Sequence, residues 1–160
     1  MSDSNELPTW TPSCKRSVNN FAKRPCHEVF DMEYLLDTVT MIRHFTGTGR
    51  LGRRAAQILE AVESSNHTLV ISVISLMEVM YLSEKNRIQL NLEDALDAIE
   101  STSVYMIADL SPEILRAAEK VQFYELYDRL ILATARWLEL GVISSDKSFR
   151  DVDGIQVVWS

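Results

Sequence analysis

Short apolar runs and amphipathic segments alternate along the chain from Tyr34 onward. The apolar runs are rich in β-branched residues, and most of them do not alternate apolar with polar positions. This pattern is typical of strands that are covered on both faces of a parallel sheet. The predicted strands are Tyr34–Leu36, Leu69–Ile71, Val104–Ile107, Gly141–Ile143 and Ile155–Val158.

Between these runs, apolar residues recur three and four positions apart, which predicts helices with one buried face. Asn91 and the sequence Ser111-Pro112-Glu113 are typical helix starts, and Ser75 with Glu78 has the form of a capping box. Strands alternating with helices predict an α/β protein, a three-layer α/β/α sandwich with a mainly parallel central sheet. The best-defined predicted helices are Arg53–Val62, Leu92–Ile99 and Asp128–Leu140.

Residues 1–30 differ in composition from the rest of the chain. They contain three of the four prolines, several serines and asparagines, and no periodic apolar pattern. Such a composition predicts a polar leader that is disordered or loosely packed. One domain is then expected over residues 31–160.

Neither a secretion signal nor a membrane segment is expected. The start of the chain lacks the basic residues and apolar run of a signal peptide, and no apolar stretch approaches the roughly 20 residues of a transmembrane helix. Cys14 and Cys26 show no metal-ligand spacing with a second cysteine pair. We therefore expect a cytoplasmic protein with reduced cysteines.

The net charge of −7 argues against a broad phosphate-binding surface. It does not exclude an enzyme that acts on RNA, because an active site built from carboxylates is itself acidic. A bound divalent metal ion would invert the sign of the charge at such a site.

Acidic residues follow several predicted strands or open a predicted helix. Asp37 ends the first strand. The second strand leads through Ser72, Val73 and Ile74 to Ser75, and Glu78 lies one helical turn further on. The fourth strand is followed by Ser144, Ser145 and Asp146, and Asp128 opens the helix before it. Because a parallel sheet places its binding crevice at the carboxyl ends of its strands, these four acids are expected to meet at one edge.

Each acid also has a structural interpretation. Asp37 could cap the helix that starts at Thr38, and Glu78 could complete the capping box with Ser75. Asp128 could interact with the positive end of its helix, and Asp146 could cap the turn after it. Taken singly, each acid is better explained as a cap. Taken together, four neighbouring carboxylates repel one another unless a cation lies between them, so both interpretations stay open.

Other common active-site patterns are missing from the sequence. It contains no Walker A loop, no GxGxxG turn after a strand and no GxSxG elbow. The three histidines are far apart and lack zinc-ligand spacing, which leaves carboxylate chemistry as the main candidate. Met77, Met80 and Trp137 are interpreted as core or interface packing residues.

Around these acids the sequence resembles the PIN-domain family, and within it the VapC-type toxins of VapBC toxin–antitoxin systems. The resemblance extends over residues 34–160, and the segment around Asp128 is its most specific part. The segments that carry it are Tyr34–Thr38 with Ile42 and Arg43, Ile71–Glu78, Tyr127–Ala135, Val142–Asp146 with Phe149, and Val157–Trp159.

The resemblance implies a PIN-like fold and metal-dependent endoribonuclease activity that leaves a 5′-phosphate and a 3′-hydroxyl. Asp37, Glu78, Asp128 and Asp146 would correspond to the family's acidic quartet, with Ser144 as a supporting hydroxyl. Such a quartet would hold Mg²⁺ or Mn²⁺, both of which favour oxygen ligands.

Two positions depart from the family pattern. Val39 stands where many relatives have a polar residue, two positions after the first acid, and Glu125 stands where an additional aspartate is frequent. Glu125 is therefore a further supporting candidate. Val39 favours an alternative function, a catalytically weak PIN scaffold that acts as an RNA-binding or assembly module.

The resemblance also implies partners: an RNA substrate, a small antitoxin and a second copy of the chain in a homodimer. Met77, Met80, Tyr81 and Leu82 follow Glu78 and are candidates for an interface, although core packing is favoured for most of them. Basic residues at the crevice rim would hold the RNA, and the candidates are Arg43, Arg50, Arg53, Arg54 and Arg129.

Overall fold

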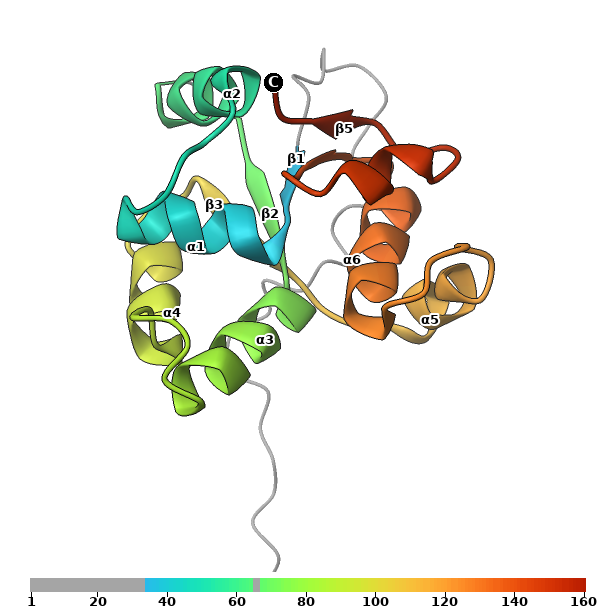
Figure 1. Ribbon diagram of the computed structural model, residues 1–160, viewed down its shortest axis with the longest axis horizontal. Helices are drawn as coiled ribbons and strands as arrows, with labels where there is room; N and C mark the ends of the chain where they lie inside the picture. The colour runs from blue at the N-terminus through green and yellow to red at the C-terminus, as the bar shows by residue number, and fades with distance from the viewer. Residues whose placement is uncertain (1–33, 65–66) are drawn as a thin grey trace, which may run out of the picture.

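A five-stranded sheet in the order β3-β2-β1-β4-β5 forms the centre of the computed structural model, which describes residues 34–64 and 67–160 (Figure 1). Every strand pairing in the described residues is parallel, so the predicted parallel sheet is confirmed. The strands are β1 (Tyr34–Leu36), β2 (Leu69–Ser72), β3 (Tyr105–Ala108), β4 (Gly141–Ile143) and β5 (Val157–Val158).

Helices cover both faces of this sheet, which confirms the three-layer α/β/α arrangement (Figure 1). Helices α5 and α6 pack on one face, and α1, α2 and α4 pack on the other with most of the buried side chains of α3. The helices are α1 (Thr38–Thr46), α2 (Arg53–Glu63), α3 (Val73–Glu84), α4 (Leu92–Glu100), α5 (Pro112–Ala118) and α6 (Leu126–Trp137), and a 3-10 helix, η2, spans Lys147–Asp151.

Neighbouring residues of the central strands point to opposite sides of the sheet. Leu35, Val70 and Val142 join the core beneath α5 and α6, whereas their successors Leu36, Ile71 and Ile143 join the core beneath α1 to α4. All six are fully buried. Strands covered in this way need apolar residues on both faces, which explains why their sequence runs do not alternate.

The capping box predicted from Ser75 and Glu78 is wrong. Helix α3 begins at Val73, directly after β2, and the Ser72 side chain caps it by accepting a hydrogen bond from the Ile74 amide. Ser75 therefore lies inside the helix. The caps predicted at Asn91 and Ser111 are confirmed, because each side chain accepts a hydrogen bond from the amide three residues later.

Three side chains that were interpreted from the sequence as core or interface packing residues are exposed. Met77 and Met80 on α3 are 39% and 40% exposed, and Trp137 at the end of α6 is 52% exposed. The core alternative is therefore wrong for these residues, because their positions on the helices face away from the sheet. An interface role stays a prediction.

The predicted leader, residues 1–30, lies outside the described part of the chain. Within the described part, no helix has the length and apolar character required to cross a bilayer.

Candidate active site

Two of the predicted site residues lie at the carboxyl ends of β1 and β4. Starting from β1, the chain adds β2 and β3 on one side of the sheet and β4 and β5 on the other. Parallel sheets usually bind their ligands where the strand order reverses in this way, between β1 and β4. Asp37 follows β1 and Ser144 follows β4. The Ser144 hydroxyl donates a hydrogen bond to Asp37 Oδ2 at 2.7 Å, so two predicted site residues from distant parts of the sequence meet here.

Asp37 is a buried carboxylate, and burial raises its pKa above the ordinary value. The hydrogen bond from Ser144 and the nearby amides of Thr38 and Val39 act in the opposite direction, while the charge of Asp146 raises the pKa further. Asp37 occupies the N-cap position of α1, yet its side chain makes no capping hydrogen bond of good geometry. Its partner is Ser144, so capping does not account for its position.

Thr38 connects α1 to α3 at this edge. Its hydroxyl lies 3.0 Å from the Ser75 hydroxyl and also contacts Glu78 Oε2. Burial raises the pKa of Glu78, and the hydrogen bond from Thr38 lowers it; the charges of Asp37 and Glu125 add to the increase. Thr38 is not among the site residues predicted from the sequence, although its position directly after a candidate acid was a usable signal.

Asp128 lies in the first turn of α6 and carries the clearest electrostatic perturbation. Burial, followed by the charges of Asp37, Glu78, Asp146 and Glu125, raises the pKa of Asp128 to about 7. All five predicted acids therefore share one electrostatic neighbourhood, which is called the acid cluster below.

Asp146 is the most peripheral of the predicted quartet. It is exposed, and its Oδ1 accepts hydrogen bonds from the Ser148 amide and hydroxyl at 2.8 and 2.6 Å. Asp146 therefore does cap η2, as its structural interpretation proposed. Its amide also donates to the Ser144 hydroxyl at 3.0 Å, which links this turn to the hydroxyl that binds Asp37.

The acid cluster is not an assembled coordination site. Within residues 34–64 and 67–160, no three acidic, histidine or cysteine side chains are close enough to coordinate one metal ion. The donor chemistry nonetheless fits Mg²⁺ or Mn²⁺, because every candidate donor is a carboxylate or hydroxyl oxygen.

The five predicted RNA-binding arginines fall into three groups. Arg43 is engaged by the fold, because Nη1 donates to the Arg50 carbonyl at 3.1 Å and the guanidinium lies 5.5 Å from the centre of the Trp159 ring. Arg50, Arg53 and Arg54 are exposed around the start of α2. Arg129 follows Asp128, and its buried Nε has no hydrogen-bond partner in the described part of the chain.

A known protein family matches the part of the chain that contains the acid cluster. The PIN domain model matches residues 34–155. Among solved structures, a toxin–antitoxin complex from Klebsiella pneumoniae has a chain with 30% identity and a TM-score of 0.54, in an alignment that covers 78% of this chain and 95% of that chain.

Two further structures have a similar fold. VapBC2 from Rickettsia felis, bound to a DNA fragment from its promoter, gives 18% identity and a TM-score of 0.62 over 81% of this chain and 100% of that chain. DNA-bound VapBC from Salmonella typhimurium gives 22% identity and a TM-score of 0.60 over 80% of this chain and 98% of that chain. A search of curated proteins found no match. With a family model that matches most of its length, the chain belongs to the PIN domain family.

Proposed function

We propose that this chain is a toxin nuclease that hydrolyses RNA phosphodiester bonds with Mg²⁺ or Mn²⁺ at the acid cluster. PIN domains are in general nucleases that use divalent metal ions, and the similar solved structures are toxin–antitoxin complexes. The proposed metal ligands are Asp37, Glu78, Asp128 and Asp146, with Glu125 and Ser144 in support.

The observation that carries this proposal is the accumulation of unbalanced negative charge at one edge of the sheet. The acids come from the ends of β1 and β4, from the middle of α3 and from the start of α6. Among the described residues, no basic side chain lies within 4 Å of any of them, since the ion pairs there join His44 to Glu63 and Arg116 to Glu113. A fold tolerates such repulsion at a cost in stability, and a divalent cation would relieve it.

Protein hydroxyls at this edge orient the proposed ligands. Ser144 holds Asp37 Oδ2, and Thr38 holds Glu78 Oε2, so two buried or half-buried carboxylates are fixed from outside the cluster. When bound, the metal ion would activate water and neutralise charge on the phosphate. Arg129, which follows Asp128 on α6, is the candidate basic side chain for contact with the same phosphate.

The proposed partners follow from the related complexes. We propose a small antitoxin, because the similar Klebsiella, Rickettsia and Salmonella structures contain one. A basic side chain of that partner, arginine above all, would compete with metal and RNA for the carboxylates. Inhibition by such a partner should weaken as salt is added, because charge pairing at an accessible groove is screened. We further propose a cytoplasmic homodimer.

The test compares RNA cleavage by the full chain and by Asp37→Asn and Asp128→Asn, each with Mg²⁺, with Mn²⁺ and with chelator. We expect cleavage by the wild type only with metal, and no cleavage by either variant. Asp97→Asn is the matched control, because Asp97 is an exposed acid on α4 outside the cluster. Cleavage that persists in chelator or in the cluster variants would reject the proposal.

One observation favours a catalytically weak scaffold as the second candidate. Val39 is 44% exposed beside Asp37, where a polar side chain would be able to hydrogen-bond near the metal. If this position limits activity, Val39→Asn should raise the cleavage rate. A wild type that binds metal and RNA but cleaves no RNA would support the scaffold function.

A further inference from the structure

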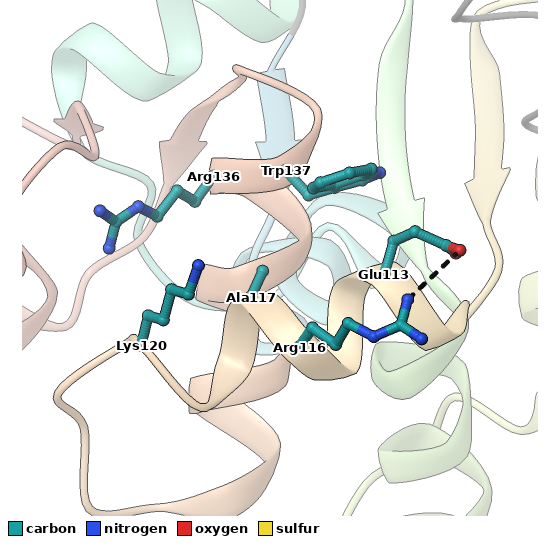
Figure 2. A pocket seen from close by; sticks show the side chains of 6 residues that line it. All are labelled: Glu113, Arg116, Ala117, Lys120, Arg136 and Trp137. Carbon is teal, nitrogen blue, oxygen red and sulfur yellow. Dashed lines mark ion pairs between the residues drawn. The ribbon is translucent and has the colours of Figure 1, made fainter.

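A hollow of about 450 Å³ lies between α5 and the C-terminal end of α6 (Figure 2). Its volume falls within the range of roughly 300–1,000 Å³ that is typical of ligand sites. Glu113, Arg116 and Ala117 lie three and four positions apart on α5, which places them on one helical face, and Lys120 lies in the turn that follows α5. The lining residues are Glu113, Arg116, Ala117, Lys120, Arg136 and Trp137.

The hollow is basic, although the whole chain has a net charge of −7. Its single carboxylate, Glu113, forms an ion pair with Arg116, with 3.8 Å between Oε1 and Nη1. Figure 2 shows this pair at one end of the hollow and the nitrogen atoms of Lys120 and Arg136 at the other. Within the described residues neither Lys120 nor Arg136 has an acidic group within 4 Å. Two cations are therefore available to an anionic ligand.

Trp137 supplies an aromatic surface in the same hollow, with its ring toward Glu113 and the nitrogen atoms of Lys120 and Arg136 on the other side (Figure 2). Half of the residue is exposed, and Ala117 across from it is small, so a planar group has room beside the indole ring (Figure 2). Exposed aromatic rings next to basic side chains are the usual means of binding single-stranded nucleic acid. The bases stack on the rings and the phosphates pair with the cations.

The hollow is separate from the acid cluster. Asp128 and Trp137 are nine residues apart on α6, which corresponds to about 13 Å along the helix axis and to opposite sides of the helix. We infer that the hollow binds nucleotides of a single-stranded RNA that lie outside the bond to be cleaved. The choice of RNA as ligand rests on the proposed function. We expect a site at this distance to bind substrate and transition state equally, an effect that appears in KM.

The test measures binding of a short fluorescein-labelled oligouridine to the full chain by fluorescence anisotropy, in chelator and over a range of salt concentrations. The double variant Lys120→Gln/Arg136→Gln should reduce the salt dependence, with the slope of log K against log salt falling by about 1.4 for two lost phosphate contacts. Trp137→Leu should weaken binding about tenfold at every salt concentration, whereas Trp137→Phe should retain most of the affinity.

The matched control is Lys85→Gln/Arg87→Gln, which removes the same charge from an exposed region at the end of α3. Its salt slope should equal that of the wild type. An equal loss in this control would show that net charge alone governs binding and would overturn the inference. Wild-type affinity in the hollow variants, or no binding by the wild type, would also overturn it.

Cleavage in Mg²⁺ separates this inference from the proposed function. A chain that binds oligouridine through the hollow but cleaves no RNA would reject the nuclease and leave the inference standing. A chain that cleaves RNA with the same KM in the hollow variants and the wild type would reject the inference alone. If both hold, the hollow variants raise KM and leave kcat unchanged.

Discussion

Two hydroxyl groups orient carboxylates of the acid cluster. Ser144 bonds to Asp37 across the neighbouring strands β1 and β4, and Thr38 bonds to Glu78 between α1 and α3. Each hydroxyl fixes one oxygen of its carboxylate and leaves the other oxygen without that restraint. Such outer contacts usually determine how well an acidic site binds its metal.

Thr38→Val tests the positioning role of this hydroxyl. It keeps the shape of the side chain and removes its hydrogen bonds, so Glu78 loses its fixed orientation. We expect RNA cleavage to fall about 10- to 100-fold and the Mg²⁺ concentration for half-maximal activity to rise. Thr38→Ser, which keeps the hydroxyl, should restore both quantities. Wild-type activity in Thr38→Val, or an equal loss in Thr38→Ser, would contradict a positioning role for the hydroxyl.

Asp128→Asn tests the electrostatic repulsion within the cluster. The amide removes one negative charge from a site where burial and four other acids raise the pKa of Asp128 to about 7. Without metal, the variant should therefore melt at the same temperature as the wild type or higher. With Mn²⁺, only the wild type should gain a large increase in Tm, because only it binds the ion tightly. A clear loss of metal-free stability would indicate a structural role instead.

At the scale of whole elements, the C-terminal segment holds α2 in place. The Trp159 carbonyl accepts a hydrogen bond from the Ala55 amide at 3.1 Å, and Arg43 of α1 lies over the Trp159 ring. Gly52 at the N-cap of α2 permits this close approach, because a Cβ built there would lie 1.9 Å from the Trp159 carbonyl oxygen.

Gly52→Ala should separate the C-terminal segment from α2. The backbone of Gly52, with φ of −62°, suits alanine, so the expected penalty comes from the clash alone. Overpacking of this kind typically costs about 1–3 kcal/mol of unfolding free energy, which denaturant titration would detect. Gln57→Ala, an exposed change on the same helix, should have little effect. An unchanged midpoint in Gly52→Ala would contradict this role of the glycine.

Most elements were predictable because their signals are local. The apolar runs and the three- and four-residue periodicity identify the strands and helices, and Asn91 and Ser111 mark their helix starts. The hydrogen bonds of Thr38 to Ser75 and Glu78 join residues that are 37 and 40 positions apart in the sequence. Local patterns do not predict them, because they depend on how α1 packs on α3. The exposure of Met77 was unpredictable for a related reason: apolar residues occur on nearly every side of α3, so its pattern does not identify the face that meets the sheet. Trp137 is the last residue of α6, where the periodic pattern ends.

At the scale of the whole molecule, helix α3 presents an apolar surface beside the acid cluster. Met77, Met80 and Tyr81 are exposed on the helix that carries Glu78, and Tyr81 is 53% exposed. Large exposed apolar side chains that lie together commonly mark protein interfaces. We therefore assign the predicted homodimer contact to this surface.

Met80→Glu tests the dimer. A buried unpaired charge disfavours association, so the variant should be a monomer at concentrations where the wild type is a dimer. Light scattering after size-exclusion chromatography measures both masses. Leu115→Glu adds the same charge to an exposed position on α5 and should leave the dimer intact. A wild type that is monomeric at high concentration would contradict the dimer prediction.

Direct measurement of metal binding tests the central claim, because a trace of contaminating ribonuclease cannot imitate it. Titration of the full chain with Mn²⁺, followed by electron paramagnetic resonance of the free ion, gives the number and affinity of sites. We predict a tight site in the wild type and in Asp97→Asn that is lost in Asp37→Asn. Absence of tight binding in the wild type, or equal binding by Asp37→Asn, would contradict a metal site at the acid cluster.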